Sequence, residues 1–270
     1  MKYKMIISDY DGTTTIGNVI PQKVVSAINK YRKLGGKFVF CTGRAEASIL
    51  DVMEKNGVGA DAVISYQGSK VLIDNKVVLN GGIDKRTIIK LIKDLRKFNK
   101  GIVIFANDEI FYEGNDGVER YVQGYRPFVK CTKFDDLLEF VNDFSGVIQK
   151  LVITKTPEED LGYVEEFIAN NYGGELLANS GGATLMEIVS VKYSKYVASS
   201  FVANAFNLKD SEVITVGDST NDLTLVEYGF GIAVGNASDR LKAVAKFIAP
   251  SIENCPLEFI IDKALSGEDF

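Results

Sequence analysis

Two carboxylates stand close together near the start of the chain, in the run Asp9-Tyr10-Asp11-Gly12-Thr13. The run follows Met5-Ile6-Ile7, which we expect to form a buried strand. In extended backbone residues i and i+2 point the same way, so Asp9 and Asp11 are expected to converge on one spot. Two converging carboxylates repel unless one holds a proton or a cation lies between them, and a hard divalent ion such as Mg²⁺ suits an all-oxygen site. An ordinary polar turn is the alternative interpretation, because Asp and Gly are common in turns.

Two further polar segments follow other apolar runs. Thr42-Gly43-Arg44 comes after Phe38-Val39-Phe40-Cys41, and a hydroxyl beside a Gly-flanked amide can donate to phosphate oxygens. The segment 217–222 adds two more carboxylates, Asp218 and Asp222, after a third apolar run. Taken singly, each segment predicts only a strand-to-helix turn with a helix cap. Together they place four carboxylates, a hydroxyl and a cation at the carboxyl ends of strands, where open α/β sheets bind ligands.

The elements that must hold these segments alternate between strand and helix patterns at both ends of the chain. Residues 1–82 and 190–270 therefore predict a parallel sheet with helices on its faces, and residues 83–189 predict an inserted α+β module. The expected elements near and within the insertion are a hairpin at 70–79, a helix at 84–97, two strands in 102–113, a strand at 147–155, a helix at 158–171 and a hairpin at 174–189 turning at Gly181-Gly182.

Composition narrows the classes of function. The chain has no histidine, which excludes Ser-His-Asp and Cys-His catalysis and leaves nucleophilic and acid–base roles to carboxylates, Lys, Tyr or Cys. A net charge of −5 without a basic run argues against nucleic-acid binding. We expect neither a signal peptide nor a membrane span, and three widely separated cysteines (Cys41, Cys131, Cys255) predict reduced thiols in a cytoplasmic protein.

In order and spacing, the polar motifs resemble those of the haloacid dehalogenase superfamily. More narrowly, the chain is similar to the Cof-type phosphatases of class IIB, whose α/β cap lies between the second and third motifs. The resemblance covers nearly the whole chain and rests on residues 9–13, 42–44, 187–188 with a downstream lysine, 217–222 and 231–237. It implies a Rossmann-like parallel-sheet core formed by residues 1–82 and 190–270, with an inserted α+β cap at 83–189.

The resemblance also implies a role for each motif residue. Asp9 would be the nucleophile, and Asp11 the acid that protonates the leaving oxygen and then the base that activates water. Mg²⁺ would be held by the Asp9 and Asp218 carboxylates and by the main-chain carbonyl of Asp11. The phosphate would be held by Gly12, Thr42, Gly43 and Lys195, with Lys192 as the second choice of lysine, and Asn221 and Asp222 would support the site.

The implied reaction is the Mg²⁺-dependent hydrolysis of a small phosphomonoester, such as a sugar phosphate or a phosphorylated cofactor, through an aspartyl-phosphate. A sugar phosphomutase and a catalytically silent binding protein are the alternatives. The chain departs from the family pattern at Gln67, where relatives have Asn, and at 254–257, where they have Asp-Gly-Val. In the insertion, Tyr121, Tyr125 and Arg126 could contact substrate, but we expect them to be surface and packing residues.

Overall fold

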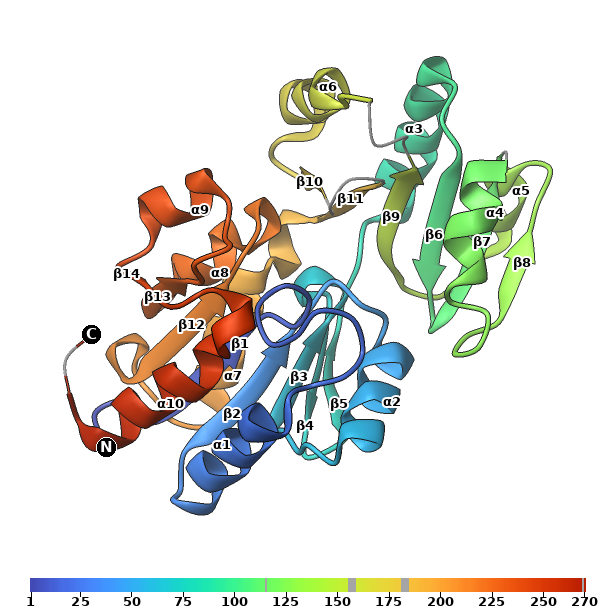
Figure 1. The fold of residues 1–270 in the computed structure, drawn as a ribbon. Coiled ribbons are helices and arrows are strands. Elements are labelled where there is room, and N and C mark those ends of the chain that lie inside the picture. Colours follow the sequence, from blue (N-terminus) through green and yellow to red (C-terminus); the bar gives the residue numbers. More distant parts are fainter. Residues whose placement is uncertain (115, 155–158, 181–184, 269) are drawn as a thin grey trace. The chain divides into compact units, whose positions relative to one another are not determined.

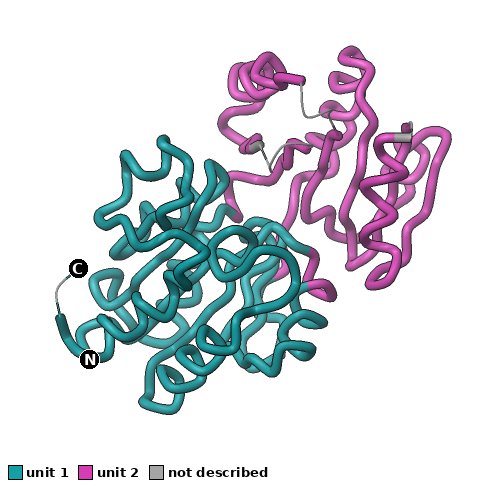
Figure 2. Tube along the Cα trace, in the orientation of Figure 1, with its two compact units in different colours: residues 1–44, 49–79, 194–270 teal, residues 45–48, 80–193 magenta. Residues whose placement is uncertain are grey.

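The computed structural model describes residues 1–114, 116–154, 159–180, 185–268 and 270. The chain divides into two compact units, which Figure 2 shows in different colours. Unit 1 consists of residues 1–44, 49–79 and 194–270, and unit 2 of residues 45–48 and 80–193. The predicted insertion limits, 83 and 189, lie inside unit 2, and the assignment of 45–48 to unit 2 was not predicted.

Unit 1 is built on an eight-stranded sheet in the order β14-β13-β12-β1-β2-β3-β4-β5 (Figure 1). The strands are β1 (Met5–Ser8), β2 (Lys37–Cys41), β3 (Ala62–Ser65), β4 (Lys70–Ile73), β5 (Lys76–Asn80), β12 (Val213–Gly217), β13 (Phe230–Ala233) and β14 (Phe247–Ile248). All neighbours from β14 to β3 pair in parallel, as predicted. The hairpin of β4 and β5 extends this sheet, with β4 antiparallel to β3, which the sequence did not indicate.

Helices cover both faces of this sheet. They are α1 (Gln22–Lys33), α2 (Glu46–Asn56), α7 (Lys195–Ala205), α8 (Leu223–Val226), α9 (Asp239–Val244) and α10 (Pro256–Ser266). Alternate residues of β1 pack against helices on opposite faces of the sheet. Ile6 lies in the apolar cluster formed with α1, α2 and α10, whereas Met5 and Ile7 lie in the cluster formed with α7. Alternate side chains of a strand point to opposite faces, so a strand covered on both sides is apolar throughout.

In its described residues, unit 2 has a six-stranded sheet in the order β10-β11-β9-β6-β7-β8 with four helices. Its elements are α3 (Lys85–Leu95), β6 (Ile102–Ala106), β7 (Glu109–Glu113), α4 (Asp116–Gln123), β8 (Cys131–Lys133), α5 (Leu137–Asp143), β9 (Ile148–Thr154), α6 (Gly162–Tyr172), β10 (Leu176–Ser180) and β11 (Leu185–Ser190). All neighbours are antiparallel except β7 and β8, so the unit is of the α+β type. In the described ranges, the helices of both units are too short or too polar to cross a membrane.

Two predicted hairpin turns have the backbone that their residues favour. Asp74-Asn75 and Asn107-Asp108 all have positive φ, which suits the tight two-residue turns of hairpins. The predicted turn at Gly181-Gly182 lies outside the described residues. The elements α4, β8 and α5 were not predicted.

Candidate active site

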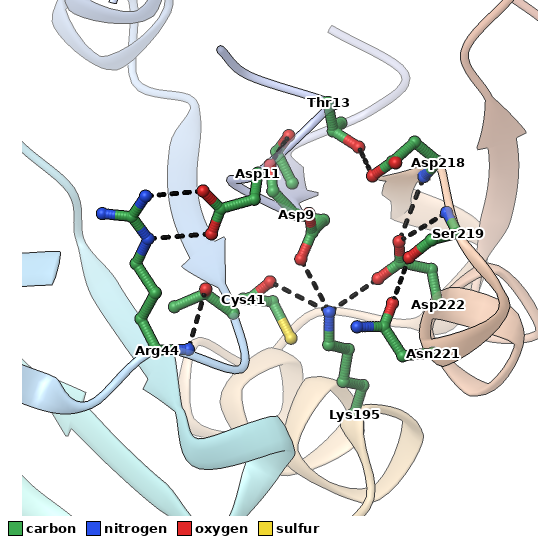
Figure 3. Close-up of polar contacts among 12 residues, drawn as sticks. Asp9, Asp11, Thr13, Cys41, Arg44, Lys195, Asp218, Ser219, Asn221 and Asp222 are labelled. Carbon is green, nitrogen blue, oxygen red and sulfur yellow. Dashed lines mark hydrogen bonds and ion pairs between the residues drawn. The ribbon is translucent and has the colours of Figure 1, made fainter. Parts of the chain in front are cut away.

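The three polar motifs meet because β12, β1 and β2 are parallel neighbours whose carboxyl ends lie at one edge of the sheet. Asp9 directly follows β1, and its N–H donates to the Val216 carbonyl at 2.9 Å. Thr42 follows β2 and Asp218 follows β12. Figure 3 shows Asp9, Asp222 and the Cys41 carbonyl around Lys195, which comes from α7.

Lys195 is the first residue of α7 and is 1% exposed. Its Nζ donates to Asp9 Oδ1 at 2.7 Å, to Asp222 Oδ1 at 2.6 Å and to the Cys41 carbonyl at 3.4 Å. Burial alone would lower the pKa of Lys195, but the Asp222 and Asp9 carboxylates outweigh burial and raise this pKa well above its usual value. The ammonium is therefore charged at any physiological pH.

Lys192, the second choice from the sequence, occupies a different environment. It lies in the short 3₁₀ turn Val191–Tyr193 of unit 2 and is exposed. Of the two lysines, Lys195 is the one that contacts the Asp9 carboxylate.

Three carboxylates form a compact acidic cluster around this lysine. Asp9, Asp218 and Asp222 each offer an oxygen within 4.8 Å of the others. Asp222 is fully engaged by the protein, because Oδ1 accepts from Lys195 while Oδ2 accepts from the N–H groups of Asp218 at 3.0 Å and Ser219 at 3.2 Å. Asp222 therefore orients Lys195 and the loop, whereas Asp9 and Asp218, which accept from Lys195 and Thr13 through Oδ1, are the carboxylates of the cluster that could also bind a ligand.

One ammonium does not neutralise three carboxylates. Burial raises the pKa of Asp9 well above its usual range, the Asp222 charge raises it further, and Lys195 opposes both. Burial and the Asp222 charge likewise raise the pKa of Asp218 to about 7. A site with excess negative charge and only hard oxygen donors fits a divalent cation such as Mg²⁺.

Two glycines allow the loops to pack this closely. Gly12 has φ +84°, and a Cβ there would lie 2.5 Å from Asp218 Oδ2. At Gly217 a Cβ would lie 2.5 Å from the Cβ of Asp222. The N–H of Gly12 donates to the Thr15 carbonyl at 2.8 Å, so a phosphate contact through this N–H would require that bond to break.

Asp11 has a different cationic partner from Asp9. Its carboxylate accepts from Arg44 Nε at 2.8 Å and from Nη2 at 2.5 Å, and its side chain is 51% exposed (Figure 3). The Asp9 and Asp11 side chains therefore do not point to the same spot, as the sequence had suggested. The expectation assumed an extended strand through Asp11, but β1 ends at Ser8. Arg44 also lies 4.6 Å from the centre of the Tyr10 ring, which fixes its orientation.

Arg44, a possible cation of the site, and Asn236 both belong to motifs identified in the sequence, but their partners were not predicted. Arg44 is 33 positions from Asp11, so only the fold reveals their pairing. Asn236 connects two loops: its Nδ2 donates to the Gly12 carbonyl at 2.9 Å and its Oδ1 accepts from the Ile252 N–H at 2.8 Å. Its place within the motif at 231–237 was the available signal.

The remaining motif residues lie nearby with local partners. Thr42 is buried, and its Oγ1 accepts from the Arg44 N–H at 3.1 Å, so its own hydroxyl proton can be directed elsewhere. Gly43 lies between these two residues. Asn221 accepts a hydrogen bond from the Ser219 hydroxyl. Gln67, which departs from the Asn expected from the family resemblance, is buried in a left-handed conformation with φ +60°.

In unit 2, the three residues considered for substrate contact are engaged with one another and with neighbours. The Tyr121 hydroxyl donates to that of Tyr125 at 3.2 Å, and Arg126 donates to the Tyr112 hydroxyl at 3.0 Å. These contacts agree with packing roles.

All three cysteines are free thiols, and burial raises the pKa of Cys41, which makes that thiol unreactive.

Comparison with known proteins agrees with this geometry. Residues 6–256 match the family of haloacid dehalogenase-like hydrolases. The chain is 26% identical to the 5-amino-6-(5-phospho-D-ribitylamino)uracil phosphatase YwtE of Bacillus subtilis, over 98% of this chain and 99% of the relative. It is 40% identical to a phosphoglycolate phosphatase of Archaeoglobus fulgidus, over 57% of this chain and 64% of the relative. A solved sugar phosphatase of haloacid dehalogenase subclass IIB has the same fold, with a TM-score of 0.81 at 16% identity over 96% of this chain and 98% of that one. The chain therefore belongs to the haloacid dehalogenase-like hydrolases.

Proposed function

We propose that the protein hydrolyses small phosphomonoesters in a Mg²⁺-dependent reaction that passes through an aspartyl-phosphate on Asp9. The observation that carries the proposal is the contact of buried Lys195 with both Asp9 and Asp222, beside the Asp218 carboxylate. A phosphate monoester carries negative charge that this acidic cluster would repel without a cation. Family membership and the relatives named as phosphatases support the same reaction.

In the first step, an Asp9 carboxylate oxygen attacks phosphorus, and the bond from phosphorus to the leaving oxygen breaks. Asp11 gives its proton to that oxygen as it leaves. The Asp9 and Asp218 carboxylates, with the main-chain carbonyl of Asp11, would hold Mg²⁺, whose charge offsets the repulsion between carboxylate and phosphate. Lys195 opposes the effects of burial and of Asp222 on Asp9, and so favours its ionised form, and it supplies a second positive charge near the phosphoryl oxygens.

In the second step, Asp11 takes a proton from water, and the resulting hydroxide attacks phosphorus and releases Asp9 with inorganic phosphate. Thr42, Gly43 and Lys195 would hold the phosphoryl oxygens throughout, and Asn221 and Asp222 would keep the loop and the lysine in place. For either step, Asp11 must rotate from its present pairing with Arg44 toward the Asp9 side. We assign Arg44 a positioning role, because its two-point pairing fixes where this rotation starts.

Unit 2 would act as the cap that excludes water from the reaction. The substrate would be a small phosphorylated metabolite, and we place the reaction in the cytoplasm because all three cysteines are free thiols. The acidic net charge argues against nucleic acid as a partner.

The test is phosphate release from para-nitrophenyl phosphate by wild type, Asp9→Asn and the surface control Asp51→Asn, with Mg²⁺ and with chelator. We expect Mg²⁺-dependent turnover in wild type and in the control, and none in Asp9→Asn. Undiminished turnover in Asp9→Asn would disprove the nucleophile assignment. Conversion of a sugar phosphate to its isomer in labelled water, with no ¹⁸O entering the phosphoryl group, would favour a mutase instead.

A further inference from the structure

Unit 2 contains a cavity of about 450 Å³ beside α5, and none of the residues assigned to the reaction lines it. This volume lies in the range of small-molecule binding sites. The cavity, here called the aromatic cavity, is lined by Phe134, Glu139, Phe140, Asp143 and Phe144. The two carboxylates are four residues apart, as are Phe140 and Phe144, so α5 presents an acidic row beside an aromatic row.

The Phe140 ring forms the floor of the aromatic cavity. One face of this ring stacks on the Phe111 ring, with centroids 3.9 Å apart and planes 19° apart. The Phe144 centroid lies 4.8 Å from that of Phe140 and 6.1 Å from that of Phe111, and for Phe134 the same two distances are 5.3 and 6.2 Å. Both rings therefore lie beside the edge of Phe140, at roughly a right angle to the direction in which it stacks. Because Phe140 is only half-buried and lines the cavity, its second face is the one turned toward it.

A cavity built from aromatic faces favours a positive charge. The face of a phenyl ring is its electron-rich side, and a cation within about 6 Å of the ring centre is attracted to it. A metal ion would find too few oxygen ligands here, and a bare ammonium would have to give up a strongly held water shell. A nitrogen that carries alkyl groups matches the apolar rings, which is why aromatic cages bind quaternary ammonium ions.

The charged side chains around the aromatic cavity also favour a cation. Glu139 and Asp143 are exposed, and in the part of the chain that the structure describes neither side chain forms an ion pair. By contrast, the carboxylate of Asp136, just before α5, is paired with Arg96 at 2.5 Å. The ammonium of Lys85 donates to two main-chain carbonyls at the end of α5, at 2.6 and 3.0 Å, and does not line the cavity. The described lining residues therefore carry two negative charges and no positive charge.

We propose that the aromatic cavity binds a small organic cation whose nitrogen carries alkyl groups, such as a quaternary ammonium ion. The alkyl groups would lie on the second face of Phe140, between Phe134 and Phe144. The positive nitrogen would lie within reach of Glu139 and Asp143. The three rings are only partly buried against the apolar core of unit 2, so packing alone does not use their exposed faces. All five lining residues belong to unit 2, and the proposal does not depend on the proposed phosphatase reaction.

A matched pair of probes tests whether the cavity recognises the positive charge. Choline carries a trimethylammonium group, and 3,3-dimethylbutan-1-ol has the same shape with carbon in place of the charged nitrogen. In titrations of the ¹⁵N-labelled full chain at constant ionic strength, we expect choline to shift the amide resonances of residues 134–144 in a saturable way. The alcohol should bind about tenfold more weakly. Equal affinity for the two probes, or choline shifts that do not saturate or do not differ from those with sodium chloride, would overturn the proposal.

Two phenylalanine substitutions test the role of the aromatic floor. Phe140→Leu keeps an apolar side chain but removes the ring, so the affinity for choline should fall about tenfold, and the affinity for the alcohol should change less. Phe98→Leu is the control, because Phe98 is also a half-buried aromatic residue of unit 2 but packs against Tyr163 and Phe167 and does not line the cavity. Choline binding by Phe140→Leu as tight as by wild type would contradict the proposed site. Amide resonances outside residues 134–144 report whether each variant is folded.

Two carboxylate substitutions test the acidic row. Asp143→Asn removes one charge at the cavity, so the affinity for choline should fall about two- to fivefold. Asp135→Asn removes the same charge from an exposed residue that does not line the cavity, so its effect should be smaller. Equal losses in the two variants would mean that choline is attracted by the general negative charge of this segment, and the proposed site would be wrong. Because Asp143 is exposed, we expect its variant to fold even if Phe140→Leu does not.

Discussion

Replacing Asp218 by Asn should stabilise the protein in the absence of divalent cations while abolishing its response to Mg²⁺. Asp218 is held near two other carboxylates, and burial with the Asp222 charge raises its pKa from 3.8 to about 7. Asn has the same shape without the charge, and its Oδ1 can still accept the hydrogen bond from Thr13, which is 2.9 Å in the wild type. The substitution thus removes one charge from the cluster and little else.

The magnitude follows from the raised pKa of Asp218. Because this pKa is higher in the folded than in the unfolded protein, the folded cation-free protein binds more protons, and its stability falls as the pH rises between about 4 and about 7. A pKa difference of one corresponds to about 1.4 kcal/mol, so the ionised carboxylate costs up to about 4 kcal/mol above pH 7. We expect Asp218→Asn to recover about 2–4 kcal/mol at pH 8, and progressively less as the pH is lowered to 5.

Thermal unfolding in chelator, at pH 8 and at pH 5, measures this difference. The melting temperature of Asp218→Asn should exceed that of wild type by several degrees at pH 8, and by less than half as much at pH 5. Adding Mg²⁺ should raise the melting temperature of wild type but not that of the variant. A variant that is less stable than wild type at pH 8, or whose advantage does not depend on pH, would refute the reasoning.

Three further substitutions test other parts of the site. Lys195→Met leaves buried carboxylates without their cation, so we expect loss of turnover and about 3–5 kcal/mol of lost stability in urea unfolding at pH 8, whereas Lys192→Met should leave both unchanged. Gly12→Ala adds a steric contact to an unfavourable φ, so it should cost about 1–3 kcal/mol more than Gly17→Ala, which has φ +81° but open space around it. Arg44→Lys removes the two-point pairing, so kcat should fall about tenfold with little change in KM, and the pH–rate profile should shift.

Local patterns were sufficient to predict the core of the fold. Runs such as Phe38-Val39-Phe40-Cys41 are apolar at every position, which is typical of a strand covered on both faces, and the polar residue after each run marks its carboxyl end. Parallel pairing then brings those ends to one edge, so the grouping of Asp9, Thr42 and Asp218 followed from strand order.

The parts that were missed depend on contacts between distant residues. The pairing of Asp11 with Arg44 and the engagement of both Asp222 oxygens are set by loop conformations, which side-chain alternation in strands does not describe. The antiparallel addition of β4 to the core sheet was missed for a related reason, since a hairpin pattern does not say which sheet the hairpin joins.

The site also explains how a protein with net negative charge can act on an anionic substrate. Folding places three carboxylates around one ammonium, an arrangement that opposes folding and that the apolar clusters on both faces of the sheet must outweigh. The excess negative charge therefore favours one order of binding. A phosphate that arrives first is repelled, whereas a divalent cation that arrives first is attracted and cancels the excess charge. The proposed reaction thus requires the excess of carboxylates. A cluster that the protein already neutralised would bind the divalent cation weakly, and the phosphoryl group would then lack its strongest positive partner, the cation.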